Sequence, residues 1–173
     1  MIAIQTGDVD IGALIAAAKK QGTGAVVVFD GVVRDDEITE MELEAYEEVA
    51  VKELEKIAQD ATGRFRLLHV DIIHRIGRLA VGENILIIVV SAGHRPEAYA
   101  GSRYIIEEIK KGVPIWKKEL TSGVGGCLVT TGMAKDLPEI ILKFSGLDLS
   151  SPTDWIFSPP FLPLNFPRIT LPP

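Results

Sequence analysis

Three segments of the chain have apolar residues at helical spacing and are predicted to form helices. Asp10 suits the N-cap of the first helix, and Pro96 suits the first turn of the third. The second carries one apolar stripe along an otherwise polar helix, which ends by Gly63. The predicted helices cover residues 11–18, 47–61 and 95–111.

Alternating or β-branched runs between these helices predict strands. The run 83–92 is almost entirely apolar, which indicates a buried strand. The other predicted strands are 24–34, with an irregularity at Gly31, and then 41–46, 66–77, 115–120 and 125–131. This order of elements predicts an α+β fold, a mostly antiparallel sheet with helices packed on one side of it.

A change in composition divides the chain near Lys135. Eight of the ten prolines lie at or beyond Pro138. We therefore expect one domain over 1–134 and a Pro-rich, apolar tail over 135–173. Such an apolar tail is expected to cover either its own subunit or a partner, and its role stays open.

Charge and cysteine content exclude several classes of protein. The net charge of −6 argues against a nucleic-acid-binding protein. The single cysteine, Cys127, cannot form an internal disulfide and is predicted to be a small buried strand residue. The three histidines and this cysteine make no metal-binding pattern, so neither a metal nor another cofactor is expected. No signal peptide or membrane span is visible, so a cytoplasmic protein is predicted.

Basic residues are concentrated at one place in this acidic chain. His94 and Arg95 follow the buried strand and precede the third helix, so they lie at a helix N-terminus, which favours anions. The planar guanidinium suits a phosphate or a carboxylate. The alternative is that Arg95 pairs with Glu97 or with a neighbouring acid on the surface.

Lysines also occur at the end of the same helix and on the strand that follows it. Lys110 is at its C-terminal end, where a cation is also favourable for structural reasons. Lys117 and Lys118 are neighbours on a strand, so one of them is expected to face inward. A lysine among cations or apolar walls has a depressed pKa, which suits proton transfer or covalent chemistry. Arg34 is a further basic candidate, whereas His74 is predicted to be structural rather than catalytic.

These segments together resemble the large, catalytic subunit of molybdopterin synthase. The resemblance covers about residues 2 to 131 and is carried by GAVVVFDGVVR (24–34), ELEAY and the helix after it, HRIGRLAVGE (74–83) and VSAGHRPEAYAGSRYIIEEIKKGVPIWKKE (90–119). It implies the α/β hammerhead type of fold and a sulfurtransferase. The implied reaction converts cyclic pyranopterin monophosphate to molybdopterin. The sulfur comes from a thiocarboxylate on the C-terminal Gly-Gly of a small ubiquitin-like partner subunit.

The resemblance also implies site residues and assembly. Lys110 and Lys117 match the two active-site lysines of the family, and Arg34, His94 and Arg95 match its anion-binding residues. The pocket-lining positions of the family match Phe29, Pro114 and Trp116. A homodimer of large subunits with a small subunit at each end is implied. The hypothesis is that Arg34, His94 and Arg95 hold the phosphate while the two lysines act beside the partner's terminal carbonyl.

Two departures from the family pattern leave alternatives open. The family commonly has an aromatic residue and an arginine near its C-terminal strand, where this chain has GVGGCLVTTG (123–132). The tail beyond Lys135 matches no part of the family and ends in Pro-Pro rather than Gly-Gly, so the sulfur donor must be a separate chain. A non-catalytic protein that only binds the small subunit, or a generic phosphoesterase or acyltransferase, are the competing interpretations.

Overall fold

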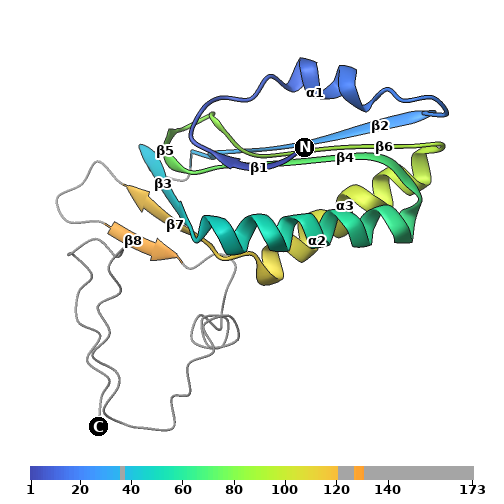
Figure 1. The fold of residues 1–173 in the computed structure, drawn as a ribbon. Coiled ribbons are helices and arrows are strands. Elements are labelled where there is room, and N and C mark those ends of the chain that lie inside the picture. Colours follow the sequence, from blue (N-terminus) through green and yellow to red (C-terminus); the bar gives the residue numbers. More distant parts are fainter. Residues whose placement is uncertain (36–37, 121–126, 131–173) are drawn as a thin grey trace, which may run out of the picture. The chain divides into compact units, whose positions relative to one another are not determined.

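The structure is a computed structural model that describes residues 1–35, 38–120 and, for the backbone alone, 127–130. It contains three helices and eight strands within these residues (Figure 1). Their order is β1 (Ile2–Gln5), α1 (Ile11–Ala18), β2 (Ala25–Val32), β3 (Glu40–Ala45), α2 (Glu47–Phe65), β4 (Leu67–Arg75), β5 (Gly77–Ala80), β6 (Asn84–Ala92), α3 (Arg95–Gly112), β7 (Ile115–Leu120) and β8 (Cys127–Thr130).

The larger layer is a four-stranded sheet with helices on both faces. Its strand order is β1-β4-β6-β2, and only the β1–β4 pair is parallel. In Figure 1, α1 covers one face, and α2 and α3 cover the other. Alternate residues of β6 serve the two faces: Ile87 and Val89 pack with α1, whereas Ile88 and Val90 belong to the main core. The α+β class and the mostly antiparallel sheet are therefore confirmed.

The prediction that the helices lie on one side of the sheet is wrong. Strands β4 and β6 carry buried apolar residues at both parities, such as Ile72 beside Ile73 and Ile87 beside Ile88. Because successive side chains of a strand point to opposite faces, both faces need a cover. Helix α1 supplies the second cover through Leu14 and Ala18. An apolar run of this kind predicts burial, but it does not say which helix lies on which face.

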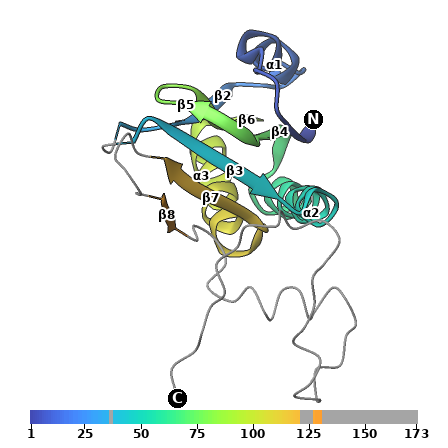
Figure 2. The same cartoon turned by 90° about the vertical axis from the view of Figure 1, so that its left-hand side faces the viewer.

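The second sheet, in the order β5-β3-β7-β8, closes one end of the core (Figure 2). Its pairs are antiparallel, and the register sets Leu43 of β3 opposite Lys117 of β7. Met41, Leu43 and Ile115 point from this sheet into the main core. The sheet therefore has one face toward the core and one face away from it, which decides where the β7 lysines point.

Two short strands and the C-terminal end of α2 differ from the sequence prediction. Strand β1 was not predicted, and the single strand expected over 66–77 is divided into β4 and β5 at Gly77, whose φ is +90°. Helix α2 continues past Gly63 to Phe65, and Arg66 takes the left-handed conformation at its C-cap. The N-cap of α1 is confirmed, because the Asp10 carboxylate accepts a hydrogen bond of 2.9 Å from the amide of Ala13.

Some sequence predictions lie outside the described residues. The tail 135–173 and most of GVGGCLVTTG are among them, so the domain boundary and the role of the tail stay predictions. Cys127 does lie in a strand, but the burial of its side chain also lies outside the description. In the part that is described, we find no helix long and apolar enough to span a bilayer. The described residues also contain no group of three or more potential metal ligands.

Candidate functional site

Three of the predicted basic residues, His94, Arg95 and Lys110, lie at the two ends of α3. His94 is the N-cap of this 18-residue helix, and Lys110 lies in its last turn. At a rise of about 1.5 Å per residue, the two ends are about 25 Å apart. Figure 1 shows α3 beginning beside the end of β6 and running back toward β7. Within one chain, His94 and Arg95 therefore cannot share a small anion with Lys110.

The N-terminal end of α3 presents an imidazole and a guanidinium to solvent. His94 and Arg95 are both exposed, and the His94 side chain makes no capping hydrogen bond. Glu97, in the first turn, pairs with Arg66 at 3.3 Å and not with Arg95. In the described part of the chain, Arg95 has no ion-pair partner, so the alternative of an Arg95–Glu97 surface pair is not what forms. This end can accept an anion at its free amides and its two basic side chains.

Lys110 lies at the other end and is also exposed. Its neighbour Lys111 pairs with Glu108 at 2.8 Å, and this pair raises the pKa of Lys111. Lys110 has no such carboxylate among the residues that the structure describes. Of the two adjacent lysines, Lys110 is therefore the one available to a ligand.

The strand register shows which of the β7 lysines faces inward. Residues directly opposite each other in an antiparallel pair share a face, so Lys117 lies on the same face as its partner Leu43, toward the core. The Lys117 ammonium lies 2.8 Å from Oε1 of Glu119, two residues along on that face. Lys118 points to the other face, where its ammonium lies 3.7 Å from Glu42. An acid, rather than an apolar wall, faces the inward lysine.

Arg34 lies at the same end of the molecule as Lys110. Strand β2 is antiparallel to β6, with Ala25 opposite Ala92 and Val32 opposite Asn84. Because α3 follows β6 and runs back along it, the end of β2 lies near the end of α3. Arg34 is exposed and follows buried Val33. The structure thus separates Arg34 from His94 and Arg95, with which the sequence hypothesis had grouped it.

The three predicted lining residues take different places. Phe29 of β2 is half-buried against the main core, and Pro114 is buried between α3 and β7. Trp116 lies on the face of β7 opposite to Lys117. The indole Nε1 of Trp116 is buried, and it has no hydrogen-bond partner within the described residues. A ligand or partner that reaches Trp116 therefore finds an unused donor.

His74 has structural surroundings, as the sequence predicted, and so does His69. The His74 side chain is buried at the end of β4, and its Nδ1 donates a hydrogen bond of 2.8 Å to the carbonyl of Arg75. Burial lowers the pKa of His74 below its ordinary value, so the imidazole is neutral. His69 is partly buried, and its Nε2 lies 2.8 Å from the Asp71 carboxylate.

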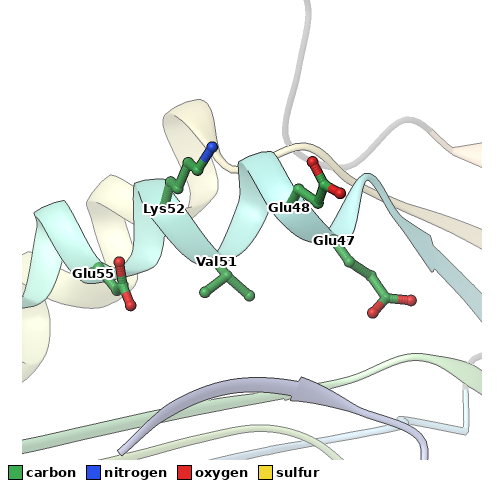
Figure 3. A pocket seen from close by; sticks show the side chains of 5 residues that line it. All are labelled: Glu47, Glu48, Val51, Lys52 and Glu55. Carbon is green, nitrogen blue, oxygen red and sulfur yellow. The ribbon is translucent and has the colours of Figure 1, made fainter.

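A surface hollow on α2 lies apart from all of these basic residues. It is lined by Glu47, Glu48, Val51, Lys52 and Glu55 (Figure 3). In Figure 3, Glu47, Val51 and Glu55 extend from the same side of the helix, as their four-residue spacing requires. Three carboxylates and one ammonium would repel a phosphate, so this hollow is not the candidate site.

Comparison with known proteins places the chain in a family. The model of the family described as MoaE protein matches residues 4–112. The chain belongs to the MoaE family. A molybdopterin synthase catalytic subunit of Pyrococcus abyssi is 44% identical over 118 residues, which are 66% of this chain and 80% of that protein. One of Ralstonia nicotianae is 40% identical over 127 residues, 70% of this chain and 72% of that one.

Solved structures of the MoaE family have the same fold. A molybdopterin synthase from Staphylococcus aureus superposes with a TM-score of 0.70 at 33% identity, covering 75% of this chain and 96% of its own. A complex of subunits 1 and 2 of molybdopterin-converting factor from Helicobacter pylori gives 0.62 at 26% identity, covering 73% and 88%. The fold class predicted through the resemblance is thereby confirmed.

Sequence reasoning missed two acidic residues that contact the segments carrying Lys117 and Arg34. Glu119 pairs with Lys117, and Glu83 lies in the turn bound to the backbone of Val33. The period of two along a strand was sufficient to place Glu119 on the face of Lys117. No local pattern brings Glu83 to Val33, because the two residues are 50 positions apart in the sequence.

Proposed function

We infer that this chain is the catalytic subunit of molybdopterin synthase, a sulfurtransferase of molybdenum cofactor biosynthesis. The observation that carries this conclusion is its membership of the MoaE family, together with relatives of that name at up to 44% identity. The reaction converts cyclic pyranopterin monophosphate to molybdopterin by placing two sulfurs on the pterin side chain. A phosphate-bearing substrate explains why a chain of net charge −6 gathers exposed cations around α3.

The sulfur donor in this proposal is a separate small subunit. The Helicobacter pylori relative was solved as a complex of two subunits, which supports a partner of this kind. The proposed partner is ubiquitin-like and ends in Gly-Gly, with a thiocarboxylate at its terminus. Its tail would reach Lys110 and Lys117, beside Phe29, Pro114 and Trp116. The buried and unused indole N–H of Trp116 is one donor that such a tail could satisfy.

The lysines would act on the terminal carbonyl of that partner. One ammonium stabilises the negative charge that develops on the carbonyl oxygen as the thiocarboxylate sulfur is transferred. The other moves a proton while the cyclic phosphate opens. Lys117 has Glu119 within 2.8 Å as a proton-accepting neighbour, whereas Lys110 is solvated and has no such neighbour in the described chain.

The spacing of the cations supports a homodimer. Arg34, Lys110 and Lys117 belong to one end of α3, and His94 and Arg95 to the other, about 25 Å away. One phosphate can contact both sets only if the second set comes from another copy of the chain. We therefore propose a composite site, in which His94 and Arg95 of one subunit complete the site of its neighbour.

The test of the function is an assay of dithiolene formation with thiocarboxylated partner. We expect the Lys110→Ala and Lys117→Ala proteins each to lose at least about 10-fold in turnover, the scale of one lost electrostatic contact in the transition state. Lys56→Ala is the matched control, because within the described residues this lysine pairs only with Glu53 on α2. Near-normal turnover in both site variants would contradict the proposal. Partner binding without product in the unsubstituted protein would favour the non-catalytic alternative.

A cytoplasmic location belongs to the same proposal. The chemistry supports it, because a thiocarboxylate donor and a dithiolene product need a reducing compartment. Fractionation of cells with an antibody against this chain tests it, and recovery outside the cytoplasmic fraction would contradict it.

A further inference from the structure

The turn between β5 and β6 is held by a buried arginine. Arg75, the last residue of β4, has a side chain that is 8% exposed, and its Nη2 donates a hydrogen bond of 3.1 Å to Oε1 of Glu83. The other oxygen of Glu83 accepts a hydrogen bond of 2.7 Å from the amide of Ala80, at the start of the turn. The Ala80 amide first, and then the Arg75 guanidinium, lower the pKa of Glu83. Both carboxylate oxygens are therefore used to close this turn.

Arg75 joins the same turn to two further segments. Its Nη1 donates to the carbonyl of Asn84 at 3.3 Å, and its Nη2 also donates to the carbonyl of Thr6, in the loop before α1, at 3.4 Å. A planar guanidinium with partners on several sides has few alternative orientations. Arg75 therefore fixes the turn to the end of β4 and to the loop that follows β1.

The backbone of the turn then holds the segment that carries Arg34. The amide of Val33 donates a hydrogen bond of 2.9 Å to the carbonyl of Glu83, and the amide of Gly82 donates one of 2.8 Å to the carbonyl of Val33. Gly82 has a φ of +89°, a conformation that L side chains rarely adopt. Val33 is 1% exposed, and both its amide and its carbonyl are hydrogen-bonded to the turn. Its backbone position is therefore fixed by the turn. Arg34 is the next residue and is exposed.

We propose that Glu83, held by Arg75, is a positioning residue for Arg34. The clamp, defined here as Arg75, Glu83 and the turn 80–83, fixes the backbone from which the Arg34 side chain extends toward the anionic substrate. This inference rests on the proposed function, in which Arg34 binds the phosphate. It gives a role to Arg75 and Glu83 of the segment HRIGRLAVGE (74–83).

The Glu83→Gln protein tests the clamp with the smallest change in shape. Glutamine loses the charge, and its NH2 group replaces one of the two oxygens that accept from Arg75 and Ala80. We expect the KM for the cyclic pyranopterin substrate to rise about 10-fold, with a smaller change in kcat, because a displaced binding group weakens substrate capture. Arg75→Lys is the second variant and should act in the same direction. Glu53→Gln, the same chemical change on α2, is the control and should leave both constants unaltered.

A double-mutant cycle separates positioning from general destabilisation. If Glu83 acts through Arg34, the protein with both Glu83→Gln and Arg34→Ala should be no worse in kcat/KM than Arg34→Ala alone. Multiplying losses, or a normal KM in Glu83→Gln, would overturn the clamp while leaving the role of Arg34 intact. A normal kcat/KM in Arg34→Ala would instead remove the role of Arg34, and the clamp with it. The lysine variants would still test the enzyme activity by themselves.

Hydrogen exchange supplies a readout that does not depend on activity. The amide of Val33 should exchange about 10-fold faster in Glu83→Gln than in the unsubstituted protein, because its acceptor is on the loosened turn. The Glu53→Gln control should leave this amide unchanged. Equal exchange at Val33 in all three proteins would overturn the proposal.

Discussion

Lys117 and Glu119 lie two residues apart on β7 and on the same face of the strand, with the ammonium 2.8 Å from Oε1 of the carboxylate. The Lys117 side chain is 36% exposed and that of Glu119 is 17% exposed, so the pair lies at the edge of the core, partly open to solvent. The carboxylate limits the orientations of a long, flexible side chain. It also offers a nearby acceptor for a proton that the lysine gives up. Lys118, one residue away, pairs with Glu42 on the opposite face.

Replacing Glu119 should therefore affect catalysis through Lys117. We expect Glu119→Gln to lower kcat by about 10-fold, equivalent to about 1.4 kcal/mol in the barrier, since the lysine loses its charged partner while the shape is kept. Glu42→Gln is the matched control, because it removes the carboxylate beside Lys118 instead. Single-turnover kinetics with thiocarboxylated partner measure the effect. Equal kcat values in the two variants would show that the Lys117–Glu119 pair has no catalytic role.

If the site is composite, a mixture of two inactive variants should regain activity. Lys117→Ala and Arg95→Ala damage opposite ends of α3, so a hybrid dimer has one site with both defects and one intact site. After subunit exchange, a 1:1 mixture should regain about a quarter of the unsubstituted activity, because about half of the dimers are hybrids. The mixture of Lys117→Ala with Lys110→Ala is the control and should stay inactive, since both lysines belong to one end. No recovery in the first mixture would favour a site within a single chain.

Replacing Gly24 or Gly63 by alanine should change the free energy of unfolding in opposite directions. A Cβ at Gly24 would collide with the backbone carbonyl of Gly93, the residue before His94, whereas a Cβ at Gly63 in α2 would meet nothing within 4 Å. Gly24→Ala should lower the free energy of unfolding by about 1–3 kcal/mol and weaken substrate binding, because Gly93 must move. Gly63→Ala should raise it by about 0.5–1 kcal/mol through the lower entropy of the unfolded chain. Urea unfolding measures both, and a stable Gly24→Ala protein would contradict the close approach.

The buried His74 should make the free energy of unfolding depend on pH. Burial lowers the pKa of His74, so between that lowered pKa and the ordinary value of about 6.5 only the unfolded chain binds the proton. The free energy of unfolding should therefore fall as the pH drops below about 6.5. His74→Asn keeps a donor for the carbonyl of Arg75 and does not titrate, so its stability should change less over the same range. Parallel pH curves for the two proteins would contradict this assignment.

Much of the fold could be predicted from local patterns. The amphipathic stripe of α2, the Asp10 cap of α1 and the apolar run of β6 depend on neighbours within a few residues, and all three were predicted correctly in kind. Strand β1 was missed, because its four residues are too few to show an alternating pattern. Strand β5 was merged with β4, because a glycine at φ +90° is not visible as a break within an apolar strand.

The sequence by itself determined which residues are candidates: a helix with basic residues at both ends, a strand with two adjacent lysines, and the motifs of the MoaE family. Only the tertiary structure decided how they combine. The register of β3 with β7 turned Lys117 inward, and the length of α3 separated His94 and Arg95 from Lys110. The turn at Gly82 and Glu83 was brought to Val33, far away in sequence. Local patterns fix the conformation of a segment, whereas distances between segments follow from burying both faces of one sheet, which depends on the whole chain.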